Sequence, residues 1–434
     1  MIAPLEKLKY PAILLGLGLL VLGAIEFYGY ISPPLRLMVW MSPEDHLLLK
    51  ERLAEFSATH GSLRVQLRCH ASQEECAKAF LSQSRSGNPP DVCLVAAQDI
   101  PLFRSKNLLV DLAPSRPNLE GFLPPAIEAV SHNKSLYAIP CGWSVVMLYY
   151  NRTLFEQHGI PFPKATWDWG DLLQAAQTLT VTEDEEEESI PLRYGLELPP
   201  DIRFWAPLIW QNRGQLIGAD GLPALLDPQF AQSNRQAMDF YAGMVREYHV
   251  APPPAKSRRI HGDLFVQQKA AMVFGGRELA SRIKNRAAFR WDAAPLPKGV
   301  QSATWLDVYG FALSSKSRHA IDARQLIDFL TSETSLATLM LNGQWSPPRR
   351  SLLKSKVYLD FPGPRGINHE GASLSLGFAR LPPPVSNWRD ASILFTDEMA
   401  QLMASPKIQV RTSAEHLQAR LDELNLLQSK LKGR

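Results

Sequence analysis

The sequence lacks the motifs of several large classes of protein. It has neither a G-x-S-x-G motif nor a P-loop, so it supports neither an α/β-hydrolase nor a nucleotide hydrolase. Its ten histidines include no close pair, which argues against a zinc site. The 46 basic and 43 acidic side chains nearly balance, which gives no case for nucleic-acid binding. We therefore expect no metal and no cofactor.

Cysteine is scarce, with four residues at positions 69, 76, 93 and 141. Cys69 ends a predicted strand and Cys76 lies just inside the next helix. A short-loop disulfide between them and a pair of free thiols are equal alternatives, because the sequence does not give their separation. Cys93 and Cys141 lie in or beside apolar strands, where we expect buried free thiols.

A long apolar run lies near the N-terminus. Lys7 and Lys9 precede residues 12–25, which favours a cytoplasmic N-terminus with the rest of the chain outside the cytoplasm. Residues 12–25 have the length of a cleaved signal, but no clean A-x-A site follows. Residues 12–31 approach the roughly 20 residues that cross a bilayer. Both alternatives stay open. We favour an uncleaved membrane anchor at 12–31, with the protein periplasmic or otherwise extracytoplasmic.

The part of the chain that follows the first 35 residues is too long for a single core and suits two lobes. Strands and helices alternate at its start, which predicts an α/β fold with mainly parallel strands. The predicted elements are strands at 35–40, 63–69 and 91–95 and helices at 46–60 and 73–83. Ligands of such sheets bind beyond the carboxyl ends of the strands. This makes the loop residues Ser42, Glu44 and Asp99 candidate ligand contacts.

The segment from Ser135 to Thr180 carries the most specific pattern in the chain. An apolar strand at Val145–Tyr150 leads into a short helix and then a second, amphipathic helix, for which we expect Thr166 as the N-cap. Between them lie the expected helix stops Gly159, Pro161 and Pro163.

This pattern resembles the family-one extracellular solute-binding proteins, the sugar-capturing subunits of ABC importers. Further segments match the family in the same order along the chain. They are NPPDV at 88–92, FVQQKAAMVFGGRELASRIKN from Phe265, PLPKG at 295–299, a predicted helix at 320–330 and NGQWSPPR at 342–349.

The resemblance implies a maltose-binding-protein-like fold, the periplasmic-binding-protein-like α/β class. Two α/β lobes are joined by a multi-strand hinge and preceded by an N-terminal hydrophobic helix. We expect a signal or anchor at 1–34. We expect lobe one at 35–142 plus 294–333 and lobe two at 143–293 plus 334–434.

The implied function is capture of a carbohydrate by hinge closure and delivery to the permease of an ABC transporter. A family member is a binding protein and not an enzyme. Two alternatives stay open on fold grounds alone: a carbohydrate-active enzyme, and a membrane-tethered sensor or interaction protein.

The candidate ligand-binding residues follow from the chemistry of sugars. Aromatic rings stack on the apolar faces of a sugar, and polar groups bind its hydroxyls. The candidate aromatic residues are Trp143, Trp205, Trp305, Tyr309 and Trp345. Gly276, Arg277 and Arg349 complete the set, because an Arg side chain binds paired hydroxyls or, more strongly, a phosphate or carboxylate. Neutral, acidic and phosphorylated sugars therefore all stay open.

Three further segments complete the expectations. Six consecutive acids at 183–188 predict a solvated loop insertion. Thr412 and Glu415 predict a capping box for a leucine-bearing C-terminal helix that packs on lobe two or, less favoured, on a partner helix. Residues 352–388 are rich in Pro and Gly and carry no assignment.

Overall fold

The computed structural model describes residues 33–61, 63–115, 117–182, 191–254, 260–361 and 368–432. The predicted anchor at 12–31 and the acidic run at 183–188 lie outside these ranges. The chain forms two compact units, Met1–Leu94 with Leu313–Leu330 and Val95–Ala312 with Thr331–Arg434. Each described unit combines β-strands with helices, which confirms the predicted two-lobed α/β class. The lobe boundaries given by the sequence stay a prediction.

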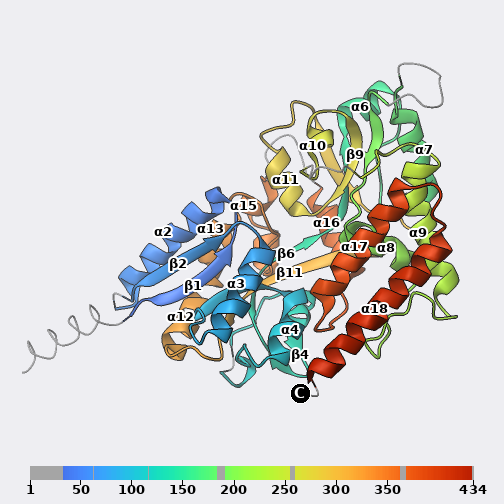
Figure 1. Ribbon diagram of the computed structural model, residues 1–434. Coiled ribbons are helices and arrows are strands. Elements are labelled where there is room, and N and C mark those ends of the chain that lie inside the picture. Colours follow the sequence, from blue (N-terminus) through green and yellow to red (C-terminus); the bar gives the residue numbers. More distant parts are fainter. Residues whose placement is uncertain are drawn as a thin grey trace, which may run out of the picture. The chain divides into compact units, whose positions relative to one another are not determined.

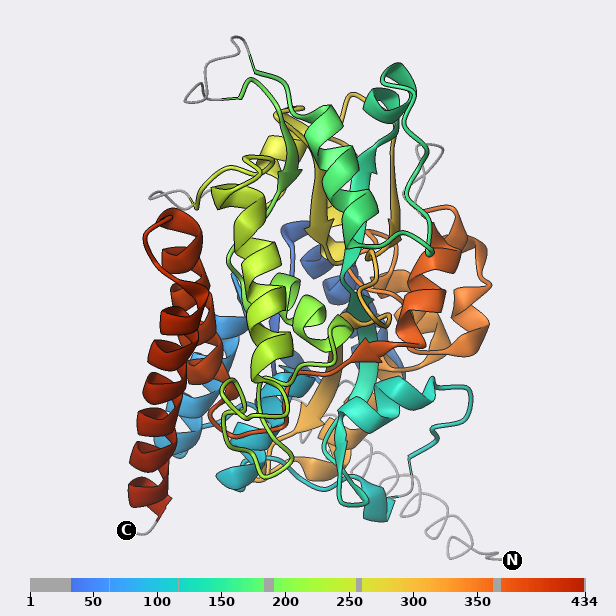
Figure 2. The ribbon, with the colours of Figure 1, turned by 90° about the vertical axis from the view of Figure 1, so that its right-hand side faces the viewer.

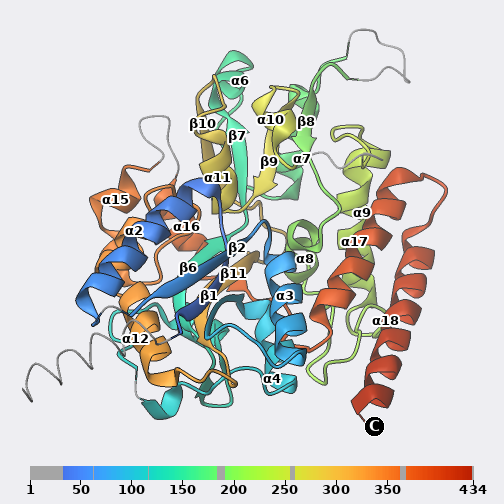
Figure 3. The same ribbon diagram turned by 60° about the vertical axis from the view of Figure 1, so that its left-hand side comes forward.

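The first unit is built on three parallel strands. Strand β1 (Leu35–Trp40) lies between β2 (Val65–His70) and β3 (Val92–Ala96). The chain moves outward from β1 to β2 and then back across β1 to β3. Because such crossovers are right-handed, this reversal places the two connecting helices on opposite faces. Figure 3 shows the strands between α2 (Pro43–Thr59) and α3 (Gln73–Arg85).

Asp91 connects the start of β1 with the second segment of this unit, which begins at Leu313. Its carboxylate accepts hydrogen bonds from Arg36 N (2.9 Å) and Ser317 Oγ (2.7 Å), and its carbonyl oxygen accepts one from Ser314 N (3.0 Å). The chain then enters α12 (Ala320–Leu330), which packs against α2 and has the bounds that the sequence predicts.

The second unit contains a four-stranded sheet in the order β10-β7-β9-β8. Strand β7 is antiparallel to both of its neighbours, and β8 is parallel to β9. The strands are β7 (Met147–Asn151), β8 (Tyr194–Glu197), β9 (Ala270–Gly275) and β10 (Trp291–Pro295). Almost every residue of these strands is buried, as expected for strands covered on both faces.

A further group of strands in this unit carries the candidate site. Strand β6 (Ile139–Val145) pairs antiparallel with the long β11 (Thr304–Leu313), which also pairs with β12 (Ala379–Arg380). The sequence predicted one strand over 145–150, which is wrong: β6 ends at Val145 and β7 begins at Met147. Between them, Val146 N donates to Trp305 O (3.1 Å). A small hairpin joins β4 (Ser131–His132) and β5 (Ser135–Leu136).

Short and long helices connect and cover these strands. They are η1 (Ala97–Asp99), α4 (Ile100–Ser105), η2 (Ala113–Ser115), α5 (Pro124–Ala129), α6 (Arg152–Gln157), α7 (Trp169–Leu179), α8 (Ile202–Gln211), α9 (Ala231–Arg246), α10 (Asp263–Val266), α11 (Arg277–Ile283), α13 (Glu333–Leu339), α14 (Arg350–Leu353), α15 (Lys356–Leu359), α16 (His369–Leu376), α17 (Trp388–Ala404) and α18 (Val410–Lys432). The unassigned segment 352–388 therefore contains short helices and strand β12.

The two C-terminal helices pack on α9 within their own unit (Figure 1), and Figure 2 shows the red pair beside the yellow-green α9. Leu417 and Leu421 are buried there, as the leucine pattern predicted. The buried Glu398 of α17 accepts hydrogen bonds from Ser413 Oγ (2.8 Å) and binds His416 Nδ1 (2.7 Å), which joins α17 to α18. The predicted capping box is wrong, because α18 begins two residues before Thr412.

Two other helix starts also differ from the prediction. Helix α2 begins at Pro43, with Ser42 as its N-cap, where the sequence analysis expected a loop. Helix α7 is capped by Asp168 in a reciprocal capping box with Asp171, and not by Thr166. In both cases a short polar side chain immediately before the helix satisfies its first free N–H groups.

All four cysteines are free thiols, so the disulfide alternative for Cys69 and Cys76 is not realised. Burial raises the pKa of the Cys93 thiol well above its usual range. No helix in the described part of the chain has the length and apolar character needed to cross a bilayer.

Gly195 of β8 gives a direct test of the packing between β8 and α7. A Cβ atom at this position would collide with the backbone of Ala176. We predict that Gly195→Ala lowers the free energy of unfolding by about 2 kcal/mol or more, because backbone cannot yield as a side chain can. Denaturant unfolding measures this change.

Gly243 of α9 provides the matched control. A Cβ there would make only ordinary contact with Tyr248, at 3.5 Å. Gly243→Ala should therefore be neutral or stabilise the protein by up to about 1 kcal/mol, because alanine favours helix. Equal effects of the two variants would contradict the packing described here.

Candidate functional site

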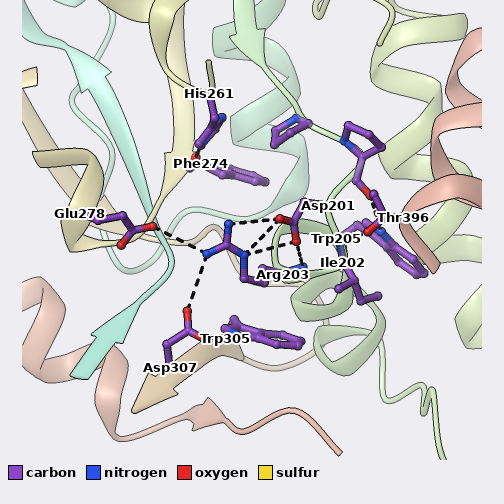
Figure 4. Close-up of polar contacts among 12 residues, drawn as sticks. Asp201, Ile202, Arg203, Trp205, His261, Phe274, Glu278, Trp305, Asp307 and Thr396 are labelled. Carbon is purple, nitrogen blue, oxygen red and sulfur yellow. Dashed lines mark hydrogen bonds and ion pairs between the residues drawn. The ribbon is translucent and has the colours of Figure 1, made fainter. Parts of the chain in front are cut away.

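Four charged side chains of the second unit meet in one place, which we call the Arg203 cluster. It consists of Arg203 with Asp201, Glu278 and Asp307, which come from the start of α8, from α11 and from β11 (Figure 4). Asp201 and Arg203 are neighbours in the sequence, but Glu278 and Asp307 are brought to them by the tertiary fold.

The start of α8 fixes Arg203. Two prolines precede the helix, and their carbonyl oxygens accept hydrogen bonds from Tyr241 Oη (2.6 Å) and Trp205 Nε1 (3.1 Å). Asp201 is the N-cap and accepts from Arg203 N (2.9 Å). The same carboxylate binds Nε (3.2 Å) and Nη2 (3.1 Å) of the Arg203 guanidinium. This two-point pair fixes the orientation of the planar guanidinium.

Strand β11 presents Asp307. Alternate residues of a strand share a face, so Trp305, Asp307 and Tyr309 point the same way. Trp305 Nε1 donates to Asp307 Oδ1 (2.9 Å), which orients the carboxylate. The cross-strand partner of Asp307 on β6 is Ser144.

Ser144 in turn connects β6 to Glu278. Its hydroxyl accepts from Arg277 N (2.8 Å) and donates to Glu278 Oε2 (3.3 Å). Gly276 makes this approach possible, because a Cβ at that position would collide with both the Ser144 hydroxyl and the Glu278 carboxylate.

The electrostatics of the cluster distinguish its carboxylates. Burial alone would raise the pKa of Asp201, but its pair with Arg203 lowers that pKa below the ordinary value. Burial raises the pKa of Asp307 to about 6, although Arg203 and the Trp305 hydrogen bond act in the opposite direction. Asp307 is therefore less fully compensated than Asp201.

One nitrogen of the Arg203 guanidinium, Nη1, has no hydrogen bond within the cluster. Arg203 Nη1 lies 3.8 Å from Glu278 Oε1 and 3.9 Å from Asp307 Oδ2, beyond hydrogen-bond length. The side chains of Arg203 and Glu278 are 34% and 35% exposed, and that of Asp307 is 13% exposed. A polar ligand atom can therefore reach this position and bridge the donor and the acceptors.

In the described ranges, no three His, Cys, Asp or Glu side chains are grouped so that they could hold a metal ion.

Comparison with known proteins gives this geometry a context. Residues 50–336 match the family described as bacterial extracellular solute-binding proteins. This chain belongs to that family. The resemblance seen in the sequence is thereby confirmed, and with it the expectation of a solute-binding protein.

The relatives of this solute-binding protein are distant in sequence. A binding protein of Brucella abortus is 24% identical over 292 residues, which is 65% of this chain and 66% of the relative. The chain thus spans about two thirds of that relative's length. The galactooligosaccharide-binding protein of Bacillus subtilis is 20% identical and is covered over 85% of its length, 86% of this chain.

The fold is more similar than the sequence. An ABC substrate-binding protein of Listeria monocytogenes, solved in complex with cycloalternan, aligns with a TM-score of 0.79 at 22% identity. The alignment covers 90% of this chain and 98% of that one. This confirms the periplasmic-binding-protein-like fold.

Four of the predicted site residues lie on or beside the face that carries the cluster: Gly276, Trp305, Tyr309 and Trp345. Burial, followed by the nearby Asp307 and Glu278 carboxylates, raises the pKa of Tyr309 well above its usual range. Trp345 packs on Gly142 and lies 5.0 Å from Tyr309 between ring centroids. All three aromatic residues are buried. Their predicted stacking on a sugar stays a prediction.

Three other predicted residues make contacts elsewhere in the same unit. Asp99 pairs with Arg389 (2.6 Å), Trp143 donates to Pro347 O (2.6 Å), and Trp205 is buried against Phe395. These contacts account for their positions by packing and pairing. Their part in ligand binding remains untested.

The two predicted arginines also have other partners. The buried Arg277 guanidinium lies 4.4 Å from the ring centroid of Tyr358 and 5.0 Å from that of Phe361. Arg349 donates to Glu120 O (3.0 Å) and lies 4.0 Å from the Phe122 ring centroid. Ligand contact by either residue likewise remains a prediction.

Ser42 and Glu44 belong to the first unit. Ser42 Oγ accepts from Asp45 N (3.1 Å) as the cap of α2, and the exposed Glu44 lies in the first turn of that helix. Acids are favoured at the N-terminal end of a helix. Helix capping and the helix dipole therefore explain why Ser42 and Glu44 occupy these positions.

The residues predicted from the sequence do not include Asp201, Arg203, Glu278 or Asp307. Asp307 could have been found, because it alternates with the predicted Trp305 and Tyr309 in one strand. The pattern Pro-Pro-Asp before an apolar helix marks Asp201 as an N-cap. No local signal identifies Arg203 or Glu278.

A separate recess of about 820 Å³ lies in the same unit, lined by Trp210, Asp220, Arg380 and Asn425 among others. None of the predicted site residues lines it. Trp210 stacks on Trp305 at 5.6 Å between ring centroids, so this aromatic pair connects the wall of the recess with the Arg203 cluster.

The raised pKa of Asp307 gives a pH-dependent prediction. Between its ordinary pKa near 4 and its folded pKa of about 6, the folded protein binds the proton more tightly than the unfolded chain. Stability from this group is therefore present at low pH and falls as pH rises through this window. Asp307→Asn keeps the oxygen that accepts from Trp305 but removes the charge.

We expect Asp307→Asn to gain about 1–3 kcal/mol of unfolding free energy relative to the native protein as pH rises from 4 to 7. Denaturant unfolding at several pH values measures this difference. Asp239→Asn, on the exposed side of α9, is the control and should show no such gain. A pH-independent difference for Asp307→Asn would refute the assignment.

Proposed function

We propose that this protein is the extracytoplasmic binding subunit of an ABC importer and that it captures a carbohydrate. Two observations support the proposal. The chain belongs to the solute-binding family, and its second unit carries the Arg203 cluster, which is partly exposed and incompletely hydrogen-bonded.

The cluster suits hydroxyl recognition. A hydroxyl group both donates and accepts hydrogen bonds. Placed beside Arg203 Nη1, it accepts from the guanidinium and donates to Glu278 Oε1 or Asp307 Oδ2. A sugar presents several such hydroxyls on a rigid ring, so more than one can be bound at little entropic cost.

The proposed capture step is closure of the two lobes on the solute, after which the permease takes it over. A ligand favours the closed form only through contacts that the open form lacks, so we propose that residues of both lobes bind it. Ser42 and Glu44 are the proposed contacts from the first unit.

The ligands of related proteins support a carbohydrate. The Bacillus subtilis relative binds galactooligosaccharides, and the Listeria monocytogenes structure contains cycloalternan. A carbohydrate-active enzyme is the competing proposal. Incubation with the bound sugar and analysis for cleavage products distinguishes the two, because a binding protein returns the sugar unchanged.

We also propose that residues 12–31 anchor the protein in the cytoplasmic membrane. The run has about the length that spans a bilayer and lacks a clean cleavage site. Full-length protein should then sediment with membranes and keep its N-terminal residues in intact-mass analysis. A soluble product that begins after residue 25 would overturn the anchor without affecting the binding function.

Replacement of Arg203, whose guanidinium is the cation of the cluster, tests the binding proposal. A thermal-shift screen of mono- and disaccharides and polyols first identifies a bound sugar, because ligand at 100 times its dissociation constant stabilises by about 2.7 kcal/mol. We expect Arg203→Met to weaken that sugar at least about tenfold in titration calorimetry, since hydrogen bonds to a charged group are lost.

Two further variants complete this test. Arg290→Met removes an exposed ion pair with Glu156 in the same unit and should leave the affinity unchanged. Glu278→Gln is used if Arg203→Met does not fold, and should weaken the same sugar. Native affinity in both cluster variants would remove the Arg203 cluster from the site.

A further inference from the structure

The Arg203 cluster contains more negative than positive charge. Three carboxylates, those of Asp201, Glu278 and Asp307, surround a single guanidinium. Asp201 alone occupies Nε and Nη2 of that guanidinium. Only Nη1 remains for the other two carboxylates, and it reaches neither within hydrogen-bond length.

Neighbouring cations among the described residues do not correct this excess. Arg282 of α11 faces Glu278 but also Asp263 and Glu197, so its charge is shared. Arg286 pairs with Asp263 at 2.9 Å. With these residues included, five carboxylates still face three guanidinium groups.

Two other basic side chains nearby, His261 and Arg277, do not compensate either. Burial lowers the pKa of His261 to about 4, so its ring is neutral near pH 7. Arg277 lies against the rings of Tyr358 and Phe361 and forms no ion pair with a carboxylate in the described part of the chain.

One oxygen in each of two carboxylates has no hydrogen bond from the described residues. Asp307 Oδ1 accepts from Trp305 and Glu278 Oε2 accepts from Ser144, which leaves Asp307 Oδ2 and Glu278 Oε1. Neither of these two oxygens has a hydrogen bond from the described residues, and both lie within 4 Å of the same Arg203 Nη1 atom. Both oxygens therefore lie around the same Arg203 nitrogen, and each is open to a further donor.

An ammonium group matches this pair of oxygens better than a hydroxyl does. It offers three donors and a positive charge, whereas a hydroxyl offers one donor and no charge. We propose that the solute is an aminated sugar or polyol, whose ammonium group binds between Glu278 and Asp307, and that the cluster rejects sugars bearing a carboxylate or phosphate. This inference rests on the proposed function and narrows it to one class of solute.

Exclusion of anionic sugars follows from the same charges. A carboxylate or phosphate placed at this position would meet two carboxylates and one guanidinium whose Nε and Nη2 are already bound. The predicted Arg277 and Arg349 contacts had left acidic and phosphorylated sugars open. The cluster instead favours cationic solutes, and neutral ones after them.

Matched sugars test the proposal by titration calorimetry at neutral pH and low ionic strength. The probes are glucose, galactose and mannose, each with its 2-amino and 2-acetamido derivative, together with glucuronate and glucose 6-phosphate. We expect one amino sugar to bind at least about tenfold more tightly than its neutral parent, because bonds to a charged donor are stronger. That preference should shrink as salt is added.

Variants locate the preference. Glu278→Gln combined with Asp307→Asn should bring the amino sugar and its parent to within about threefold of each other. Asp239→Asn, an exposed acid on α9, is the control and should keep the native preference. The comparison within one variant cancels any general effect of the substitutions on folding.

The outcomes separate the two proposals. Neutral or anionic sugars that bind as tightly as the amines overturn the amine proposal and leave carbohydrate capture in place. An amine preference that persists in the double variant also overturns it. If no sugar of the panel binds, the amine proposal fails, and the disaccharides and polyols of the thermal-shift screen decide carbohydrate capture separately.

Discussion

The two-point ion pair between Asp201 and Arg203 is the interaction on which the proposed site depends. It caps α8, fixes the plane of the guanidinium and occupies two of its three nitrogens. The remaining nitrogen is held between Glu278 and Asp307, from α11 and β11, without bonding either fully. Because Asp201 binds Nε and Nη2, the guanidinium has a fixed orientation. Because Nη1 forms no hydrogen bond to Glu278 or Asp307, it remains able to bind a ligand.

The supporting contacts explain why the fold maintains this arrangement. Trp305 donates to Asp307, Ser144 donates to Glu278, and the absence of a side chain at Gly276 leaves room for both Ser144 and Glu278. Aromatic residues predicted to stack on a sugar are buried, and one of them positions a carboxylate. Polar recognition of the solute is therefore better supported by the contacts than aromatic stacking is.

The family and the α/β class could be predicted from the sequence, because both depend on the order of local patterns. The NPPDV segment and helix α12 are examples in which the local pattern decides the structure. Helix starts were less accurate, since the caps Ser42 and Asp168 compete with nearby polar residues. The Arg203 cluster could not be predicted, because its members are brought together only by packing of α8, α11 and β11.

A crystal structure with the tightest-binding amino sugar tests the central claim most directly. The account predicts that the sugar nitrogen lies within hydrogen-bond distance of Glu278 and Asp307 and that a hydroxyl accepts from Arg203. A well-ordered sugar that makes no contact with these three side chains would contradict it.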